Sequence, residues 1–282
     1  MEIRINGQDV DITIDSEKTI GEIIAGLDRL LANSGHRLSG LSIDGQAGDT
    51  SLLEQFFSRE IDSVKTLDIY TKTIAELTAI SLLSLIGDIE EYESLKFEEK
   101  GEFIKEWKER PQSLFASEQA PELYSLYNDL FSNGGIGCQA LRSITEEWLR
   151  EVENPQEEFA KLNPLVEEIC SRLVDFPLDI QTGKDARAAQ SITIFSGITE
   201  KIFRILGQLN NQGYLSQADD EKPLNLIISE FGSVVRELLE AYEKNDSVLV
   251  GDLAEYEAAP RLQELYNSII NNSRKAAAQG KK

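Results

Sequence analysis

The sequence predicts an α+β protein, in which a small α/β domain at residues 1–72 precedes a large all-α helical bundle at residues 73–272. Two observations predict this order. Apolar and polar residues alternate near the N-terminus and again before Lys72, as in strands, whereas beyond Lys72 the apolar residues recur with the period of helices. Residues 273–282 are small, polar and basic, and we expect a disordered tail there.

The N-terminal segment begins with a predicted β-hairpin. Asn6-Gly7 separates two alternating runs, and this dipeptide favours the positive φ angles of a tight turn. The apolar residues of the two runs share one face, with the side chains Ile3, Ile5, Val10, Ile12 and Ile14.

A helix is predicted after the hairpin. Thr19 and Glu22 have the spacing of a capping box, and apolar residues then recur with helical period until Asn33-Ser34-Gly35. A strand at 41–43, a turn at Asp44-Gly45, a helical turn at 52–57 and a strand at 64–71 complete the segment.

Hairpin, helix, strand, short helix and strand is the element order of the β-grasp, and in this order residues 1–72 resemble ubiquitin-like domains. The resemblance implies the β-grasp fold and no particular activity. Ubiquitin-like modifiers and sulfur carriers end in a free Gly-Gly tail, whereas this last strand continues through Lys72-Thr73-Ile74 into a helix. Conjugation and sulfur transfer are therefore disfavoured.

The face of the sheet away from the helix is predicted to be polar. Its side chains are Glu2, Arg4, Asp11, Thr13, Thr66, Asp68 and Tyr70. The apolar recognition patch of ubiquitin's sheet is therefore not expected here.

Helical periodicity continues through the rest of the chain. Residues 74–89 are apolar nearly all round, so we expect this helix to be buried on most faces. Pro111 and Pro121 separate two shorter helices, and Phe176-Pro177 is expected to close another. The predicted helices are 74–89, 97–107, 123–131, 136–152, 162–173, 186–209, 224–242 and 254–270.

The helix at 224–242 carries one continuous apolar stripe. It consists of Ile227, Ile228, Phe231, Val234, Val235, Leu238, Leu239 and Tyr242. Such a stripe requires a cover, either from the chain itself or from a second copy.

Charge and composition limit the partners and the compartment. Fifty acidic against 28 basic residues give a net charge of -22, which disfavours nucleic acid. We interpret this charge first as a solvated surface that keeps the chain soluble, and second as a preference for a basic protein partner. No apolar run reaches the length of a membrane span, and residues 1–6 do not resemble a secretory signal. Cys138 and Cys170 do not form a disulfide framework, so we expect a cytoplasmic, reducing compartment.

The residues that usually carry chemistry are scarce. His36 is the single histidine, which excludes mechanisms that need two, and it offers no zinc-ligand spacing with the two distant cysteines. The glycine-containing segments 133–137 and 181–185 do not follow strands and lack the spacing of a phosphate-binding loop. We therefore expect no catalytic residue, no cofactor and no metal site.

Three hypotheses follow for function. The first is a non-catalytic protein-binding module, namely an adaptor, scaffold or assembly chaperone, whose helical-hairpin grooves and acidic surface bind another protein. The second is an enzyme with a carboxylate-only, magnesium-dependent site. Its candidate ligands are Asp219, Asp220 and Glu221, or Asp252 and Glu255, with Glu257 and Tyr256 nearby. The third is a structural subunit that self-associates through the helix at 224–242.

Overall fold

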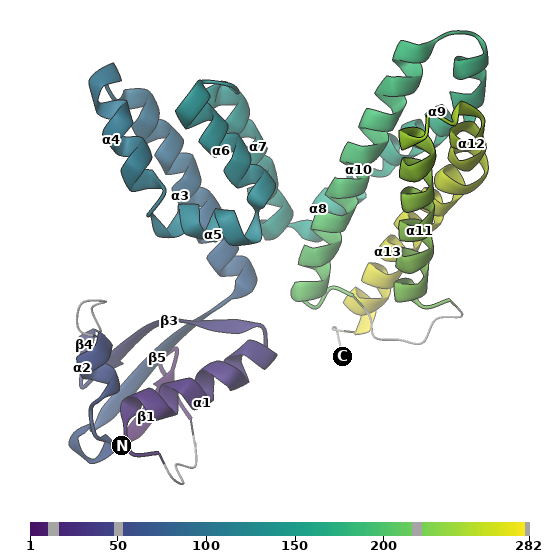
Figure 1. The fold of residues 1–282 in the computed structure, drawn as a ribbon. Helices are drawn as coiled ribbons and strands as arrows, with labels where there is room; N and C mark the ends of the chain where they lie inside the picture. The colour runs from purple at the N-terminus through teal and green to yellow at the C-terminus, as the bar shows by residue number, and fades with distance from the viewer. Residues whose placement is uncertain (11–16, 48–52, 216–221, 280–282) are drawn as a thin grey trace. The chain divides into compact units, whose positions relative to one another are not determined.

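The computed structural model describes residues 1–10, 17–47, 53–215 and 222–279 (Figure 1). It confirms the α+β class, because a mixed sheet at the N-terminus precedes a helical remainder. The chain divides into two compact units, Met1–Arg142 and Ser143–Lys282, which we call the N-terminal and C-terminal units. Each is described separately below.

Within the described residues, the sheet of the N-terminal unit has five strands in the order β2-β1-β5-β3-β4. The strands are β1 (Glu2–Ile5), β2 (Gln8–Asp9), β3 (His36–Ile43), β4 (Gln46–Ala47) and β5 (Thr66–Thr73). β1 lies parallel to β5, with Ile3 opposite Leu67, and antiparallel to β2. β3 pairs antiparallel with the other edge of β5 and is longer than the predicted strand at 41–43.

The predicted hairpin turn is confirmed. Asn6 and Gly7 have φ angles of 48° and 79°, the positive values that favour Asn and Gly in a tight turn. The Asn6 side chain also accepts a hydrogen bond from the backbone N–H of Thr71 at 2.9 Å, which ties the turn to β5. Asp11, Ile12, Thr13 and Ile14 lie outside the described residues.

Helix α1 (Ile20–Asn33) covers one face of the sheet. Its predicted capping box forms, since Glu22 N–H donates to Thr19 Oγ1 and Glu22 Oε2 accepts from the Thr19 N–H, both at 3.4 Å. α2 (Leu53–Phe57) and the 3₁₀ turn η2 (Ile61–Ser63) lead into β5. The core between helix and sheet contains Ile3, Ile20, Ile23, Ile24, Leu27, Leu41, Ile43, Phe56, Val64, Leu67 and Ile69.

The helices of the N-terminal unit follow β5 directly. They are α3 (Ile74–Ser94), α4 (Phe97–Trp107), α5 (Pro111–Gln119), α6 (Pro121–Asn133) and the start of α7 (Cys138–Glu153). Thr73, the last residue of β5, forms a capping box with Glu76, so strand and helix join without a linker. Pro111 and Pro121 each occupy the first turn of a helix, as expected for residues that cannot continue one.

The expectation that residues 74–89 are buried on most faces is wrong. Ile80 and Leu83 are 45% and 53% exposed, because α3 packs against α4 and α5 along a single face. That face contains Leu82, Leu85, Asp88 and Ile89.

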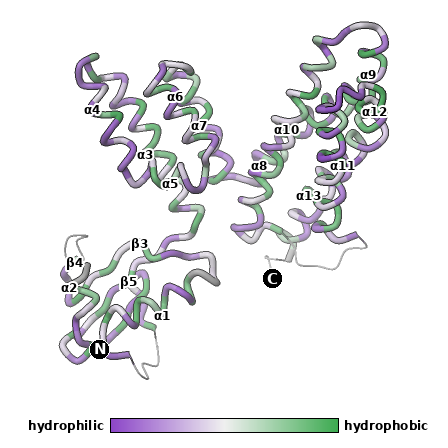
Figure 2. The backbone as a smooth tube through the Cα atoms, viewed as in Figure 1, coloured by the Kyte–Doolittle hydropathy of each residue, from purple (hydrophilic) through white to green (hydrophobic). Residues whose placement is uncertain are grey.

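The C-terminal unit is a helical bundle around one core. Its helices after α7 are α8 (Pro155–Ala160), α9 (Asn163–Gln181), α10 (Asp185–Asn211), α11 (Leu224–Glu243), α12 (Ser247–Asp252), the π-helical segment η3 (Leu253–Ala258) and α13 (Ala259–Gln279). Green and purple alternate along α10 and α11 in Figure 2, as expected for helices with one buried face.

Two predicted helix ends in this unit are wrong. α9 continues through Pro177 to Gln181, because Phe176 anchors it in the core and Gly251 of α12 leaves room for the proline ring. α13 continues to Gln279, so residues 273–279 of the predicted disordered tail are helical. Ser273 is buried there and its hydroxyl accepts a hydrogen bond from Gln156 at 3.0 Å.

Candidate binding surface

Helix α11 carries two adjacent rows of apolar positions, of which the described residues fully bury only one. The inner row is Ile227, Phe231, Val234, Leu238 and Ala241, and all of these are buried. The outer row, one residue later at each step, is Ile228, Gly232, Val235, Leu239 and Tyr242; we call it the outer seam. Leu239 and Tyr242 of the outer seam are 52% and 50% exposed. Ile228 and Val235 of the outer seam are partly buried against the core of the bundle, so the predicted stripe is open mainly at Leu239 and Tyr242.

Gly232 lies in the middle of the outer seam, over open space. A Cβ added at this position would meet no atom within 4 Å outside the local helix. Glycine inside a helix costs about 1 kcal/mol relative to alanine, so folding alone favours alanine here. The helical glycines Gly87, Gly101, Gly197 and Gly207 also have open space around an added Cβ, so Gly232 is not unusual in this chain.

Aromatic rings connect the inner row of α11 to α10. The Phe231 ring lies 6.2 Å from the rings of both Phe195 and Phe203, measured between centroids. Phe195 and Phe231 are buried, whereas Phe203 is partly exposed. These ring contacts pack the inner row of α11 against α10.

Helix α12 adds apolar surface next to the C-terminal end of α11, which it contacts. Asp246 caps this helix by accepting a hydrogen bond from the Leu249 N–H at 3.1 Å. Val248 is 73% exposed and Leu249 44% exposed. Exposed apolar side chains of this size are typical of interaction sites when they gather on neighbouring elements.

The segment that bears this surface is strongly acidic. Residues 224–258 contain eight acidic side chains, Glu230, Glu237, Glu240, Glu243, Asp246, Asp252, Glu255 and Glu257, and two basic ones, Arg236 and Lys244. Within the described part of the chain, Glu237, Glu243 and Asp246 take part in no salt bridge. Their negative charge is therefore available to a partner.

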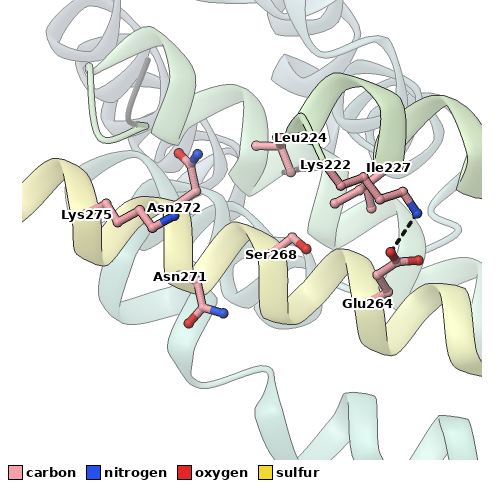
Figure 3. A pocket seen from close by; sticks show the side chains of 8 residues that line it. All are labelled: Lys222, Leu224, Ile227, Glu264, Ser268, Asn271, Asn272 and Lys275. Atoms are coloured by element: carbon pink, nitrogen blue, oxygen red, sulfur yellow. Dashed lines mark hydrogen bonds and ion pairs between the residues drawn. The ribbon is translucent and has the colours of Figure 1, made fainter. Parts of the chain in front are cut away.

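A polar pocket of about 360 Å³ lies between the start of α11 and α13 (Figure 3). Lys222 points across it and donates a hydrogen bond to Glu264 at 2.7 Å, and it pairs with Glu230 at the same distance. The hydrogen bond to Glu230 raises the pKa of Lys222, and the same contact lowers the pKa of Glu230. Two carboxylates thus neutralise this lysine, and its charge is not available to a bound anion.

An ion cluster around the buried Glu151 joins α7 to α10 in the C-terminal unit. Glu151 is 1% exposed and accepts hydrogen bonds from Nε and Nη2 of Arg204, the second at 2.9 Å. Lys201 pairs with Glu147 and Glu151, and the Arg204 guanidinium stacks 4.4 Å from the centroid of the Trp148 ring. Because every charge in this cluster has a partner, its role is to fix the two helices together.

The structure describes only some of the candidate magnesium ligands. Asp219, Asp220 and Glu221 lie outside the described residues. Asp252 and Glu255 lie on α12 and η3, and in the described ranges no three His, Cys, Asp or Glu side chains form a group that could hold a metal ion. The Tyr256 hydroxyl interacts with Glu255, which raises the pKa of the tyrosine.

His36 and the two cysteines occupy structural positions. His36 begins β3, and its Nδ1 lies 3.0 Å from the Ser34 carbonyl oxygen. Cys170 is partly buried in α9, donates a hydrogen bond to the Ala259 carbonyl at 3.4 Å, and burial raises its pKa to about 11. Burial also raises the pKa of Cys138. Neither thiol is activated by its surroundings.

Comparison with known proteins matches the two ends of the chain to different family models. Residues 1–73 match the TP0873 N-terminal domain, and residues 157–268 match a domain of unknown function, DUF8042. The first match ends where β5 ends, and the second contains the whole of α11 and its outer seam. Nearly the full chain is similar to an uncharacterized protein of Treponema pallidum (strain Nichols), at 20% identity over 273 residues, or 96% of this chain and 97% of the relative. No solved structure matches the chain.

Across the described residues, no helix is long and apolar enough to cross a membrane. Sequence reasoning had found the α11 stripe but not its division into a buried and an open row. The one-residue offset between the rows was visible in the sequence, whereas which row the bundle covers depends on packing.

Proposed function

We propose that this protein is a non-catalytic protein-binding module, an adaptor, scaffold or assembly chaperone, that holds its partner on the helices of the C-terminal unit. The observation that carries this proposal is the outer seam, where Leu239 and Tyr242 remain half exposed beside the fully buried Phe231. The exposed apolar residues of α12 extend the same kind of surface.

The N-terminal domain serves in this proposal as a ubiquitin-like recognition or positioning domain. The strand order β2-β1-β5-β3-β4, with the first and last strands parallel, supports the ubiquitin-like resemblance. On the open face of the sheet, Arg4 lies among Glu2, Asp9 and Asp68, so this face is polar and internally paired. We therefore assign the main binding role to the C-terminal unit.

The net charge of -22 supports a basic protein partner and disfavours nucleic acid. A cytoplasmic location agrees with the two free cysteines. The acidic surface would speed the encounter with a basic partner, so the association rate is expected to fall as salt rises.

The test is affinity capture from native cytosol with the full chain as bait, at low and then high salt, with mass spectrometry of the bound proteins. A stoichiometric basic partner that salt releases is the expected result. An empty bait at low salt would contradict the proposal, and a rise in melting temperature with magnesium would then favour the carboxylate enzyme.

A self-associating structural subunit is the second candidate, because the same outer seam could pack against its copy. Sedimentation of the purified protein separates the two. A monomer at micromolar concentration favours the adaptor, and a dimer favours self-association.

A further inference from the structure

We propose that the open face of the N-terminal sheet binds an acidic segment of a second protein, through Arg37, Tyr70 and Lys72. The proposal goes beyond the function given above, which places the main partner on the C-terminal unit. It is carried by the strand register, by two positive charges that the fold leaves without a partner, and by a half-exposed tyrosine beside them.

The register of β3 against β5 places two basic side chains opposite each other. Arg37 is the cross-strand partner of Lys72, and Leu38 is the partner of Thr71. Leu38 packs against the core beneath α1, so Arg37 and Lys72, each one residue away, share the open face. Residues directly opposite in an antiparallel pair have Cβ atoms about 5 Å apart, and like charges there destabilise the sheet.

The other charged pairs across the described strands are complementary. Arg4 lies opposite Asp9 on β2 and opposite Asp68 on β5, and its guanidinium lies 3.1 and 3.9 Å from their carboxylates. Arg37 donates a hydrogen bond to the carbonyl of the preceding residue at 3.0 Å, and within the described ranges neither it nor Lys72 forms a salt bridge. The fold therefore neutralises Arg4 and leaves two positive charges at the other end of the face.

The carboxylate of Glu76 does not neutralise this basic pair. Its Oε2 accepts hydrogen bonds from the Thr73 N–H at 2.7 Å and from the Thr73 hydroxyl at 3.1 Å, which commits it to the cap of α3. The two Thr73 hydrogen bonds chiefly lower the pKa of Glu76, and Lys72 adds a smaller effect. With Glu76 held in the cap, the Arg37 guanidinium and the Lys72 ammonium keep hydrogen-bond donors for a ligand.

Tyr70 adds an aromatic contact to the same site. It lies opposite Gly40 and two residues before Lys72, so its side chain is on the open face, and the residue is 47% exposed. A Cβ added at Gly40 would lie 3.6 Å from Cδ2 of the ring, so the ring lies against the glycine. A tyrosine ring offers a flat apolar surface and a hydroxyl, a combination that is enriched at protein interfaces.

The chemistry of the site selects an acidic protein segment. A guanidinium binds a carboxylate through two parallel hydrogen bonds, and a neighbouring ammonium attracts a second one. Nucleic acid does not fit, because Glu2 and Asp68 would repel a phosphate backbone that continued along the face. A second copy of this chain, at a net charge of -22, would be repelled as a whole. An Asp- or Glu-containing segment with an apolar side chain matches both the basic pair and the ring.

The test measures binding of fluorescent peptides to the full chain by fluorescence anisotropy. The acidic probe carries the sequence Asp-Phe-Glu-Asp within a Gly- and Ser-rich peptide, and a matched amide probe has Asn and Gln in place of the acids. Arg37→Gln and Lys72→Gln each remove one charge of the site. Arg29→Gln is the control, since it removes an exposed charge from α1, which covers the opposite face of the sheet.

We expect the wild type and Arg29→Gln to bind the acidic probe equally, with an affinity that falls as salt rises. Arg37→Gln and Lys72→Gln should each bind it at least roughly tenfold more weakly, because each loses charge-assisted hydrogen bonds. Both variants should keep or raise the melting temperature, because each removes a like-charge repulsion. The amide probe should not bind.

No binding of the acidic probe by the wild type, equal binding of the amide probe, or equal binding by Lys72→Gln and wild type would overturn the proposal. A lower melting temperature in both Arg37→Gln and Lys72→Gln would also overturn it, because the pair would then stabilise the domain itself. A wild-type dimer in sedimentation that Lys72→Gln dissociates would assign the site to a second copy instead.

Discussion

The indole Nε1 of Trp107 donates a hydrogen bond to Asp88 Oδ2 at 3.1 Å, and both side chains are buried between helices of the N-terminal unit. Arg110 donates to the other carboxylate oxygen of Asp88 at 2.6 Å and Gln112 to both oxygens. This network joins α3 to the end of α4 and the start of α5. The hydrogen bonds of this network satisfy the Asp88 carboxylate, which lies in the core between these helices.

Removal of Asp88 should therefore destabilise the N-terminal unit. Asp88→Ala leaves Trp107 Nε1 without its acceptor and Arg110 without a buried partner, and we expect a loss of about 3 kcal/mol in unfolding free energy. Glu91→Ala is the control, because Glu91 pairs with the same arginine but is 46% exposed, and its loss should cost less than about 1 kcal/mol. Urea denaturation followed by Trp107 fluorescence in a Trp148→Phe background measures both. Equal losses for the two variants would contradict this account of the network.

Asp44 should have a lowered pKa in the folded protein. Its Oδ1 accepts hydrogen bonds from the backbone N–H groups of Thr66 and Lys65, both at 2.9 Å, and these bonds lower its pKa below the ordinary value of 3.8. As the pH falls, Asp44 therefore takes up a proton at a higher pH in the unfolded chain than in the folded protein. The stabilisation is complete above pH 3.8 and is lost as the pH falls through the lower, folded value. Titration of the carboxyl group by NMR measures the pKa; a value at or above 3.8 would show that the turn does not hold the ionised form.

Two glycines of α1 should respond oppositely to alanine. A Cβ at Gly21 would lie 3.0 Å from the carbonyl oxygen of Phe57 and 3.1 Å from its Cβ, whereas one at Gly26 would meet nothing within 4 Å. Gly21→Ala should lower the melting temperature because α2 must move away. Gly26→Ala should raise stability by up to about 1 kcal/mol. Thermal denaturation of both variants tests the pair, and stabilisation by Gly21→Ala would mean that α1 and α2 do not pack this closely.

Cys170 should resist thiol reagents in the native protein. Burial raises its pKa to about 11, so few molecules carry the reactive thiolate near neutral pH. In a Cys138→Ser variant, labelling of the remaining thiol should be slow and should accelerate about tenfold per pH unit below the pKa. The unfolded chain, with an ordinary pKa of 9.0, should react much faster at the same pH. Rapid native labelling near pH 7 would indicate that α9 opens around this residue.

The sequence predicted the elements whose signals are local. Asn6-Gly7, the Thr19 capping box, Pro111 and Pro121 each act within a few residues, and the structure confirms each of them. Signals that depend on tertiary packing were misleading. Pro177 is expected to end a helix, but α9 continues through it, with Phe176 and Asp179 buried. Residues 74–89 are expected to be buried on most faces, although the partners of α3 cover one face.

The candidate site was predicted only in part, because it too depends on tertiary packing. The apolar positions of α11 are evident from their period, yet two rows offset by one residue cannot be ranked without knowing which row faces the core. Gly232 gave no signal of its own, because a single glycine in a helical pattern has many explanations. In the structure an added Cβ at Gly232 meets no described atom within 4 Å, as at several other helical glycines.

The most direct test of the outer seam as a binding surface is site-specific photo-crosslinking in native cytosol. A photoreactive residue replaces Arg236, which is exposed next to Val235 of the seam, and in a control it replaces Arg274, which is exposed on α13. We predict a single protein adduct from position 236, on the protein that the bait captures, and no such adduct from position 274. The same adducts from both positions, or crosslinks from position 236 to a second copy of this chain, would contradict the account.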